Sequence, residues 1–256
     1  MSPIIEKTVV LENIKASADS HILVLSSEKI GRLTQPGQFV EVSCDPDHLV
    51  LKRPFSVYEA NEETLSLYVK RVGKGSQWLQ QLRSGGSLEI IGPLGNGYRI
   101  IESGRCLLIG GGCGIASLKM LSREIEERGG SSDAIFGFKT AAEIPQTAIE
   151  AFQTHTGTMT VTVEMGLYPK TGTVVDRLKE LTIGAYQHFY TCGPIGMLKA
   201  LVPFLQTLDT QVSLEMRMAC GFGVCYGCSV KTVSGNKRVC CEGPVFSMQE
   251  VDWHDL

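Results

Sequence analysis

The sequence predicts a β plus α/β protein with an N-terminal antiparallel β-barrel, a doubly wound parallel-sheet domain and a small C-terminal domain. Short β-like runs fill the chain up to about Tyr98, strand and helix patterns alternate from Arg105, and cysteines crowd the stretch after Ser213. These changes of pattern place the expected domains at residues 1–100, 101–210 and 211–256.

The N-terminal part contains short runs rich in β-branched and aromatic residues, at 8–11, 21–25, 38–42, 56–58, 64–69 and 87–91. Polar turns separate these runs, which is typical of a small antiparallel barrel. One helix is expected at about 76–82, because Ser84-Gly85-Gly86 follows it as a stop signal.

The middle part alternates apolar strands with helical patterns. Strands are expected at 106–110, 134–138, 159–163 and 188–191, and helices at 115–128, 144–152, 174–181 and 195–208. This alternation indicates a parallel sheet with helices on both of its faces.

Composition excludes several classes of protein. The chain has 256 residues, 43% of them hydrophobic, and a net charge of -3, which gives no signal for binding nucleic acid. The first residues lack a basic segment followed by an apolar core, and no run is long enough to span a bilayer, so we expect a soluble, cytoplasmic protein without a membrane partner. Nine cysteines are an odd number, and those at 44, 106, 113 and 192 are expected to be reduced thiols.

The most informative motif is Cys220-x4-Cys225-x2-Cys228, followed after eleven residues by Cys240. This spacing is that of a plant-type [2Fe-2S] loop, and the glycines within it allow the backbone to approach the sulfurs closely. A structural zinc site is the alternative, although no second Cys pair or nearby His completes one. The residues alone leave Cys240 and Cys241 open as the fourth ligand, since only one of two neighbours in an extended segment faces the cluster.

Two glycine-rich turns are expected at the carboxyl edge of the parallel sheet, where nucleotides bind. They comprise Gly110, Gly111, Gly112 and Gly114 in the first turn, and Cys192, Gly193 and Pro194 in the second. The alternative for either turn is a tight bend required only for packing. Asp133 lies about twenty residues after the first turn, where an acidic ligand for the ribose is usual. However, Asp133 begins its expected strand, whereas such a ligand lies at the end of a strand.

A second phosphate site is expected on the barrel. Its candidate residues are Arg53, Pro54, Phe55 and Ser56, then Tyr68, Val69 and Lys70, and finally Gly75 with Ser76 at a helix N-terminus. An Arg fork and free helix amides suit a pyrophosphate, although an isolated Arg is more often a surface charge.

These motifs, in this order, resemble those of the ferredoxin-NADP reductase superfamily. The segments 215–228 and 238–246 resemble more closely the electron-transfer subunits of the NAD-linked, class 1B dihydroorotate dehydrogenases, and the resemblance covers essentially the whole chain. That family ends in Val-Cys, two variable residues and Gly-Pro-Val-Phe, which assigns the fourth cluster ligand to Cys240. The chain departs from the family at Glu164-Met165-Gly166-Leu167, where an Asp-Gly-Ser turn is usual.

The resemblance implies FAD in the barrel, held by the candidate residues at 53–56, 68–70 and 75–76, NAD(H) on the sheet domain and a [2Fe-2S] cluster at the C-terminus. It also implies a separate FMN-containing catalytic subunit, joined in a heterotetramer, that oxidises dihydroorotate in pyrimidine (UMP) biosynthesis. Hydride transfer between nicotinamide and flavin needs alignment of the two rings, so no catalytic acid or base is expected.

Two other functions fit the motifs. One is the reductase subunit of another ferredoxin-NADP reductase-like complex, of the transhydrogenase or sulfide dehydrogenase type. The other is a zinc-stabilised nucleotide-binding module without redox activity, which would be colourless where a flavin and iron–sulfur protein is yellow-brown.

Overall fold

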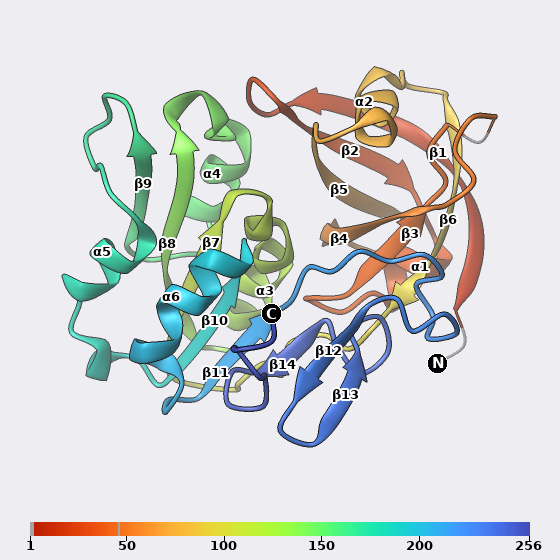
Figure 1. Ribbon diagram of the computed structural model, residues 1–256. Helices are drawn as coiled ribbons and strands as arrows, with labels where there is room; N and C mark the ends of the chain where they lie inside the picture. The colour runs from red at the N-terminus through yellow and green to blue at the C-terminus, as the bar shows by residue number, and fades with distance from the viewer. Residues whose placement is uncertain (1–2, 46) are drawn as a thin grey trace.

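The computed structural model describes residues 3–45 and 47–256. A β-barrel and a helix-flanked sheet lie side by side, and a C-terminal hairpin packs where the two meet (Figure 1). None of the helices among these residues is long and apolar enough to cross a membrane.

The barrel is closed, with the strand order β1-β2-β5-β4-β3-β6 and antiparallel neighbours throughout. Its strands are β1 (Ile4–Lys15), β2 (Ser20–Ser26), β3 (Phe39–Val42), β4 (Arg53–Ala60), β5 (Thr64–Lys70) and β6 (Ser87–Leu94). Alternate residues of the strands point inward and form one buried apolar cluster, which includes Leu23, Leu25, Val40, Leu67 and Ile90. The prediction of an antiparallel barrel is confirmed.

Two short helices accompany the barrel. Helix α2 (Lys74–Gln81) matches the predicted one, whereas α1 (Lys29–Leu33) was not expected. Five residues are too few to show a helical period, and α1 begins where the Glu6 carboxylate accepts hydrogen bonds from the backbone N–H groups of Lys29 and Ile30. This long-range cap leaves no local signal in the sequence.

The second sheet has six strands in the order β14-β11-β10-β7-β8-β9. They are β7 (Arg105–Gly111), β8 (Ser131–Thr140), β9 (Met159–Met165), β10 (His188–Cys192), β11 (Thr210–Ser213) and β14 (Val245–Ser247). All neighbours are parallel except β14, which pairs antiparallel with β11. Strand β11 spans the expected boundary at residue 210, and β14 brings the C-terminal stretch into this sheet.

Helices cover both faces of this sheet, which confirms the doubly wound prediction. Helices α3 (Ala116–Glu127) and α4 (Gln146–Gln153) bury their apolar residues with one face of the strands, in a cluster that contains Phe136, Phe152 and Tyr190. Helices α5 (Val174–Lys179) and α6 (Ile195–Leu205) do the same on the other face. Alternate residues of β7 join the two clusters, as expected for a strand buried on both sides.

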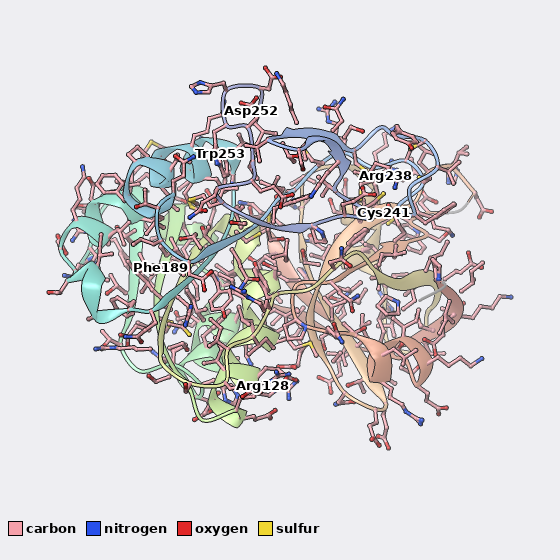
Figure 2. The ribbon with its side chains drawn as sticks, turned by 90° about the horizontal axis from the view of Figure 1, so that it is seen from below. Arg128, Phe189, Arg238, Cys241, Asp252 and Trp253 are labelled. Atoms are coloured by element: carbon pink, nitrogen blue, oxygen red, sulfur yellow. The ribbon has the colours of Figure 1, made fainter. Side chains whose placement is uncertain are left out.

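The C-terminal stretch forms the hairpin β12 (Ser229–Thr232) and β13 (Gly235–Arg238) before β14. Val230, Val239 and Trp253 belong to the same buried cluster as α5 and α6. Figure 2 shows Trp253 above the helices of the sheet domain, while Arg238 and Cys241 lie on the side of the barrel. The small C-terminal part is therefore stabilised by packing against the sheet domain.

Candidate functional site

A cavity of about 940 Å³ opens between the barrel and the C-terminal stretch. The predicted barrel residues gather in its lining: Arg53, Pro54, Phe55, Ser56, Tyr68, Lys70, Gly75 and Ser76. Val69 is the exception, because its side chain is buried in the apolar core of the barrel. The cavity is large enough for a bulky cofactor, since typical ligand pockets measure roughly 300–1,000 Å³.

The N-terminus of α2 forms one wall of this cavity. The Ser76 hydroxyl oxygen accepts hydrogen bonds from the backbone N–H groups of Val72 (2.9 Å) and Gly73 (3.1 Å), which fixes the turn that enters the helix. A Cβ atom added to Gly75 would lie 3.2 Å from Cβ of Cys44, so a larger residue would crowd this wall. Free amides at such a helix start favour an anionic group.

Arg53 reaches the cavity from the start of β4. Its Nη1 donates to the backbone carbonyls of Leu51 (2.7 Å) and Lys52 (3.0 Å). The guanidinium makes no ion pair with a carboxylate among the described residues and retains donors for a ligand.

The segment Ser213–Met218 lines the same cavity from the other side. Glu215 is open to the cavity, and its carboxylate lies 3.8 Å from the Cys113 sulfur and 3.9 Å from the Cys192 sulfur. Enclosure by the surrounding protein raises the pKa of Glu215. Hydrogen bonds with the thiols of Cys113 and Cys192 lower this pKa, but by less than enclosure raises it. Burial likewise raises the pKa of the Cys113 thiol to about 12. The sequence motifs did not identify Glu215 as a site residue.

A second cavity, of about 630 Å³, lies at the carboxyl edge of the parallel sheet. Gly111, Gly112 and Pro194 of the predicted turns line it, together with Lys139 and Glu164 near the ends of β8 and β9. Gly112 has φ of +54°, and a Cβ atom there would meet no atom within 4 Å, so this residue leaves the turn open to a ligand.

The other predicted glycines of these turns pack the two turns together. A Cβ atom on Gly114 would lie 2.4 Å from the Cys192 carbonyl oxygen, and one on Gly110 would lie 2.8 Å from Cγ2 of Ile115. Gly193 is similarly crowded by Met197, and Cys192 is fully buried. Asp133 binds Arg105 and the Tyr186 hydroxyl, in agreement with its exclusion as a ribose ligand.

Lys70 connects the two cavities, because it lines both. Its Nζ lies 2.6 Å from the carboxylate of Glu143, on the sheet domain, and 3.6 Å from that of Asp19, on the barrel. The two cavities are therefore neighbours that share the Lys70 side chain.

The four predicted cluster cysteines lie in two pairs. In the first pair, Cys225 contacts Cys220, and the backbone N–H of Cys225 donates to the Cys220 sulfur at 3.5 Å. In the second pair, Cys228 contacts the buried Cys240. Residues 3–45 and 47–256 contain no set of three His, Cys, Asp or Glu side chains placed for a single metal ion. Two pairs of thiols fit a two-iron centre, in which four cysteines share two irons.

The backbone of the loop supports thiolates. Partial burial alone would raise the pKa of Cys220, but hydrogen bonds from the backbone amides of Cys225, Phe222 and Val224 outweigh it and lower that pKa to about 6. Gly221 and Gly223 take positive φ values of 76° and 89°, which turn the amides toward the sulfur. The thiolate is the form that ligates iron.

Cys241 adjoins the second pair. Its sulfur is 3.9 Å from that of Cys240 and packs against Gly223, where a Cβ atom would lie 2.4 Å from it. Arg238 holds the same loop by donating to the Gly223 carbonyl oxygen (2.8 Å), while its guanidinium lies over the Tyr226 ring, 4.9 Å from its centroid. Figure 2 shows Arg238 and Cys241 close together on this side of the molecule.

Solved structures share this architecture. The chain aligns with a TM-score of 0.88 and 27% identity to a protein described under "Insights into flavin-based electron bifurcation via the NADH-dependent reduced ferredoxin-NADP oxidoreductase structure", covering 97% of this chain and 91% of that one. The flavohem-like FAD/NAD binding domain of nitric oxide dioxygenase from Vibrio cholerae aligns with a TM-score of 0.69 and 22% identity, over 80% of this chain and 96% of that one. The second likeness supports the fold alone.

Sequence relatives are more specific. A family model for the iron–sulfur cluster binding domain of dihydroorotate dehydrogenase B matches residues 215–252. The chain is 37% identical to the dihydroorotate dehydrogenase B (NAD(+)) electron transfer subunit of Caldanaerobacter subterraneus, covering 96% of this chain and 97% of that one. It is 32% identical to the subunit of the same name from Fusobacterium nucleatum, and the alignment covers 97% of this chain and 98% of that one. The chain therefore belongs to the family of dihydroorotate dehydrogenase B (NAD(+)) electron transfer subunits.

Proposed function

We propose that this chain carries electrons from an FMN-containing dihydroorotate dehydrogenase catalytic subunit to NAD⁺, as part of a cytoplasmic heterotetramer in pyrimidine (UMP) biosynthesis. The observation that supports this most directly is the continuity of the three sites. Lys70 borders both cavities, and the segment Ser213–Met218 lines the large cavity immediately before Cys220. Nucleotide, flavin and iron–sulfur sites would thus adjoin one another along one path.

The barrel cavity is assigned to FAD. Arg53 and the amides at the start of α2 would bind its phosphates, and the strand segments 54–56 and 68–70 would border its ring. A larger residue in place of Gly75 would crowd Cys44 and the stem of Arg53 in this wall.

The sheet cavity is assigned to NAD(H). The open turn at Gly112 admits a ligand between the strand ends, and the turn at Pro194 lines the cavity opposite it. Lys139 supplies a positive charge, while Glu164 offers a carboxylate to ribose hydroxyls.

FAD exchanges a hydride equivalent with NAD(H) and single electrons with the [2Fe-2S] cluster, whose ligands we assign to Cys220, Cys225, Cys228 and Cys240. The chain's own residues would bind these groups, hold the two rings in contact and exclude water. Cys113, Cys192 and Glu215 lie beside the cavity, but hydride transfer requires none of them as an acid or base.

The cluster loop is assigned as the docking surface for the catalytic subunit. Phe222, Val224 and Tyr226 are 47%, 71% and 64% exposed, respectively, so much of their apolar surface is open to a partner. Exposed apolar side chains beside an electron-transfer centre suit a stable interface with the electron donor.

A second function is favoured by the likeness to the solved structure titled for an NADH-dependent reduced ferredoxin-NADP oxidoreductase. In that case the chain would be the reductase subunit of a transhydrogenase-type complex, and its electron partner would be a ferredoxin rather than an FMN protein.

Coexpression with the FMN catalytic subunit of the same organism separates the two functions. The proposed function predicts a yellow-brown complex whose flavin and cluster absorbance bleaches when dihydroorotate is added anaerobically. Bleaching by reduced ferredoxin and not by dihydroorotate would support the second function instead. A colourless protein containing zinc would contradict both.

A further inference from the structure

Glu41 is a buried carboxylate that the proposed electron path does not use. It lies on β3 of the barrel and is only 1% exposed. Neither of its carboxylate oxygens has a hydrogen-bond partner among the residues that the structure describes. An ionisable group buried without partners costs free energy, so its presence calls for a physical role.

The Glu41 side chain packs directly against the cluster loop. A Cβ atom added to Gly221 would lie 2.5 Å from Cγ of Glu41 and 2.8 Å from its Oε1. Gly221 also has φ of +76°, so both its backbone conformation and the contact with Glu41 require glycine. Since Gly221 follows the ligand Cys220, the carboxyl group is adjacent to the cluster site.

The neighbouring cations are bound to other groups. Lys52 pairs with Glu89 at 2.7 Å, and Arg53 donates to the carbonyls of Leu51 and Lys52. Burial raises the pKa of Glu41 to about 7, and the charge on Cys220 adds to this effect, while Arg53 and Lys52 oppose it. No side chain among the described residues pairs with the Glu41 carboxyl group, so in its ionised form its charge would act on the adjacent loop without a direct counter-ion.

We propose that Glu41 lowers the reduction potential of the [2Fe-2S] cluster and so favours passage of the electron from the cluster to FAD. A reduced cluster carries one more negative charge than an oxidised one, and a buried carboxylate beside it makes that charge less favourable. With both groups bound, two single electrons from the cluster and one proton would give FAD the hydride equivalent that NAD⁺ accepts. This inference rests on the proposed cluster site, but not on the identity of the partner subunit.

The test is Glu41→Gln, which keeps the size of the side chain and removes its charge. The midpoint potentials of the cluster and of FAD are measured by anaerobic redox titration of the purified holoprotein at pH 8.5, with EPR and visible absorbance as readouts. The potential of the cluster is expected to rise by about 59 mV or more, equal to a tenfold change in the equilibrium for one electron. The potential of FAD is expected to shift by less.

Three variants control for other effects. Glu41→Asp keeps the charge and is expected to stay close to the wild-type potential. Glu63→Gln removes a carboxylate from an exposed barrel turn and is expected to leave the cluster potential unchanged. Glu41→Met is a second uncharged variant that suits a site without hydrogen-bond partners, and it serves in place of Glu41→Gln if that protein does not fold.

An unchanged cluster potential in Glu41→Gln or Glu41→Met would overturn the proposal. A shift of equal size in Glu41→Asp would also overturn it, because geometry and not charge would then be the cause. A shift confined to FAD would assign Glu41 to the flavin site. Iron and acid-labile sulfide are determined in the wild type first, since their absence would contradict the cluster assignment itself.

Discussion

Two adjacent cysteines, Cys240 and Cys241, have different surroundings. Cys240 is buried beside Cys228, whereas the sulfur of Cys241 packs against the backbone of Gly223. We expect Cys240→Ser to lose the cluster and Cys241→Ser to retain it, because only Cys240 completes the second pair of thiols. Iron and acid-labile sulfide content of the two variants is the measurement. A cluster lost only from the Cys241 variant would reverse the assignment.

Arg53 retains donors toward the large cavity, so Arg53→Ala should weaken FAD binding. Loss of a charge-assisted contact costs about 1.5–3 kcal/mol, which corresponds to roughly 10- to 150-fold in Kd. Flavin content after extended dialysis measures the effect, and Arg71→Ala is a control because Arg71 does not line the cavity. Full FAD retention together with weakened NADH binding would show that the two sites have been interchanged.

Glu215 should make stability depend on pH, because enclosure raises its pKa above the ordinary value of 4.5. A carboxyl group with a raised pKa contributes stability that is fully present below 4.5 and is lost as pH rises through the higher value. The difference in Tm, Glu215→Gln minus wild type, is therefore expected to increase as the pH is raised from 5 to 8, because only the wild type loses this stability.

Thermal unfolding followed by circular dichroism measures this difference, with Glu63→Gln on an exposed barrel turn as the control. A difference in Tm between Glu215→Gln and the wild type that stays constant with pH would contradict the prediction.

At the same scale, the sequence motifs predicted candidate cofactor residues from spacing or backbone freedom. The barrel residues around Arg53 lie together along one cavity, and the four cysteines lie in two pairs; their roles as ligands stay predictions. Glu41 and Glu215 carry no such signal. Each is a single carboxylate whose role depends on what the fold places opposite it, Gly221 in one case and two thiols in the other.

At the scale of elements, the cluster loop presents exposed apolar side chains. We expect Tyr226→Glu to abolish copurification with the catalytic subunit, because a charge would be buried in the interface. NADH-dependent reduction of an artificial dye should remain, since the dye takes electrons from FAD directly. Val233→Glu is the matched control, because Val233 is 78% exposed at the turn of the C-terminal hairpin, away from the cysteines. Release of FAD or iron from Tyr226→Glu would show that the loop has an internal role.

Elements with a clear period were predictable, and those that depend on distant partners were not. The barrel strands and helices α3 to α6 followed their apolar patterns. Strand β11, Thr-Gln-Val-Ser, is fully buried but mostly polar, so hydrophobicity did not reveal it. Strand β11 pairs with β10 on one side and with β14, from the C-terminal stretch, on the other. Its place in the sheet thus depends on a partner that is distant in the sequence.

At the scale of the whole molecule, β14 and the buried C-terminal residues attach the cysteine loop to the sheet domain, while Gly221 and Glu41 attach it to the barrel. Asn96, which follows β6 of the barrel, also binds the C-terminal stretch, because its side-chain amide donates to the backbone carbonyls of Cys241 and Glu242. The cluster loop is thereby held beside both of the other sites. Such an arrangement suits a relay in which electrons pass within one chain between fixed centres.

In the proposed function, electrons from dihydroorotate reach NAD⁺ through the cluster and FAD of this chain. The most direct measurement is dihydroorotate-dependent reduction of NAD⁺ by the complex with the catalytic subunit, comparing the wild type with Cys225→Ser. We expect Cys225→Ser to keep FAD and NADH-dependent dye reduction but to lose nearly all reduction of NAD⁺ by dihydroorotate. A variant that lacks the cluster and still couples dihydroorotate to NAD⁺ at the wild-type rate would contradict the account.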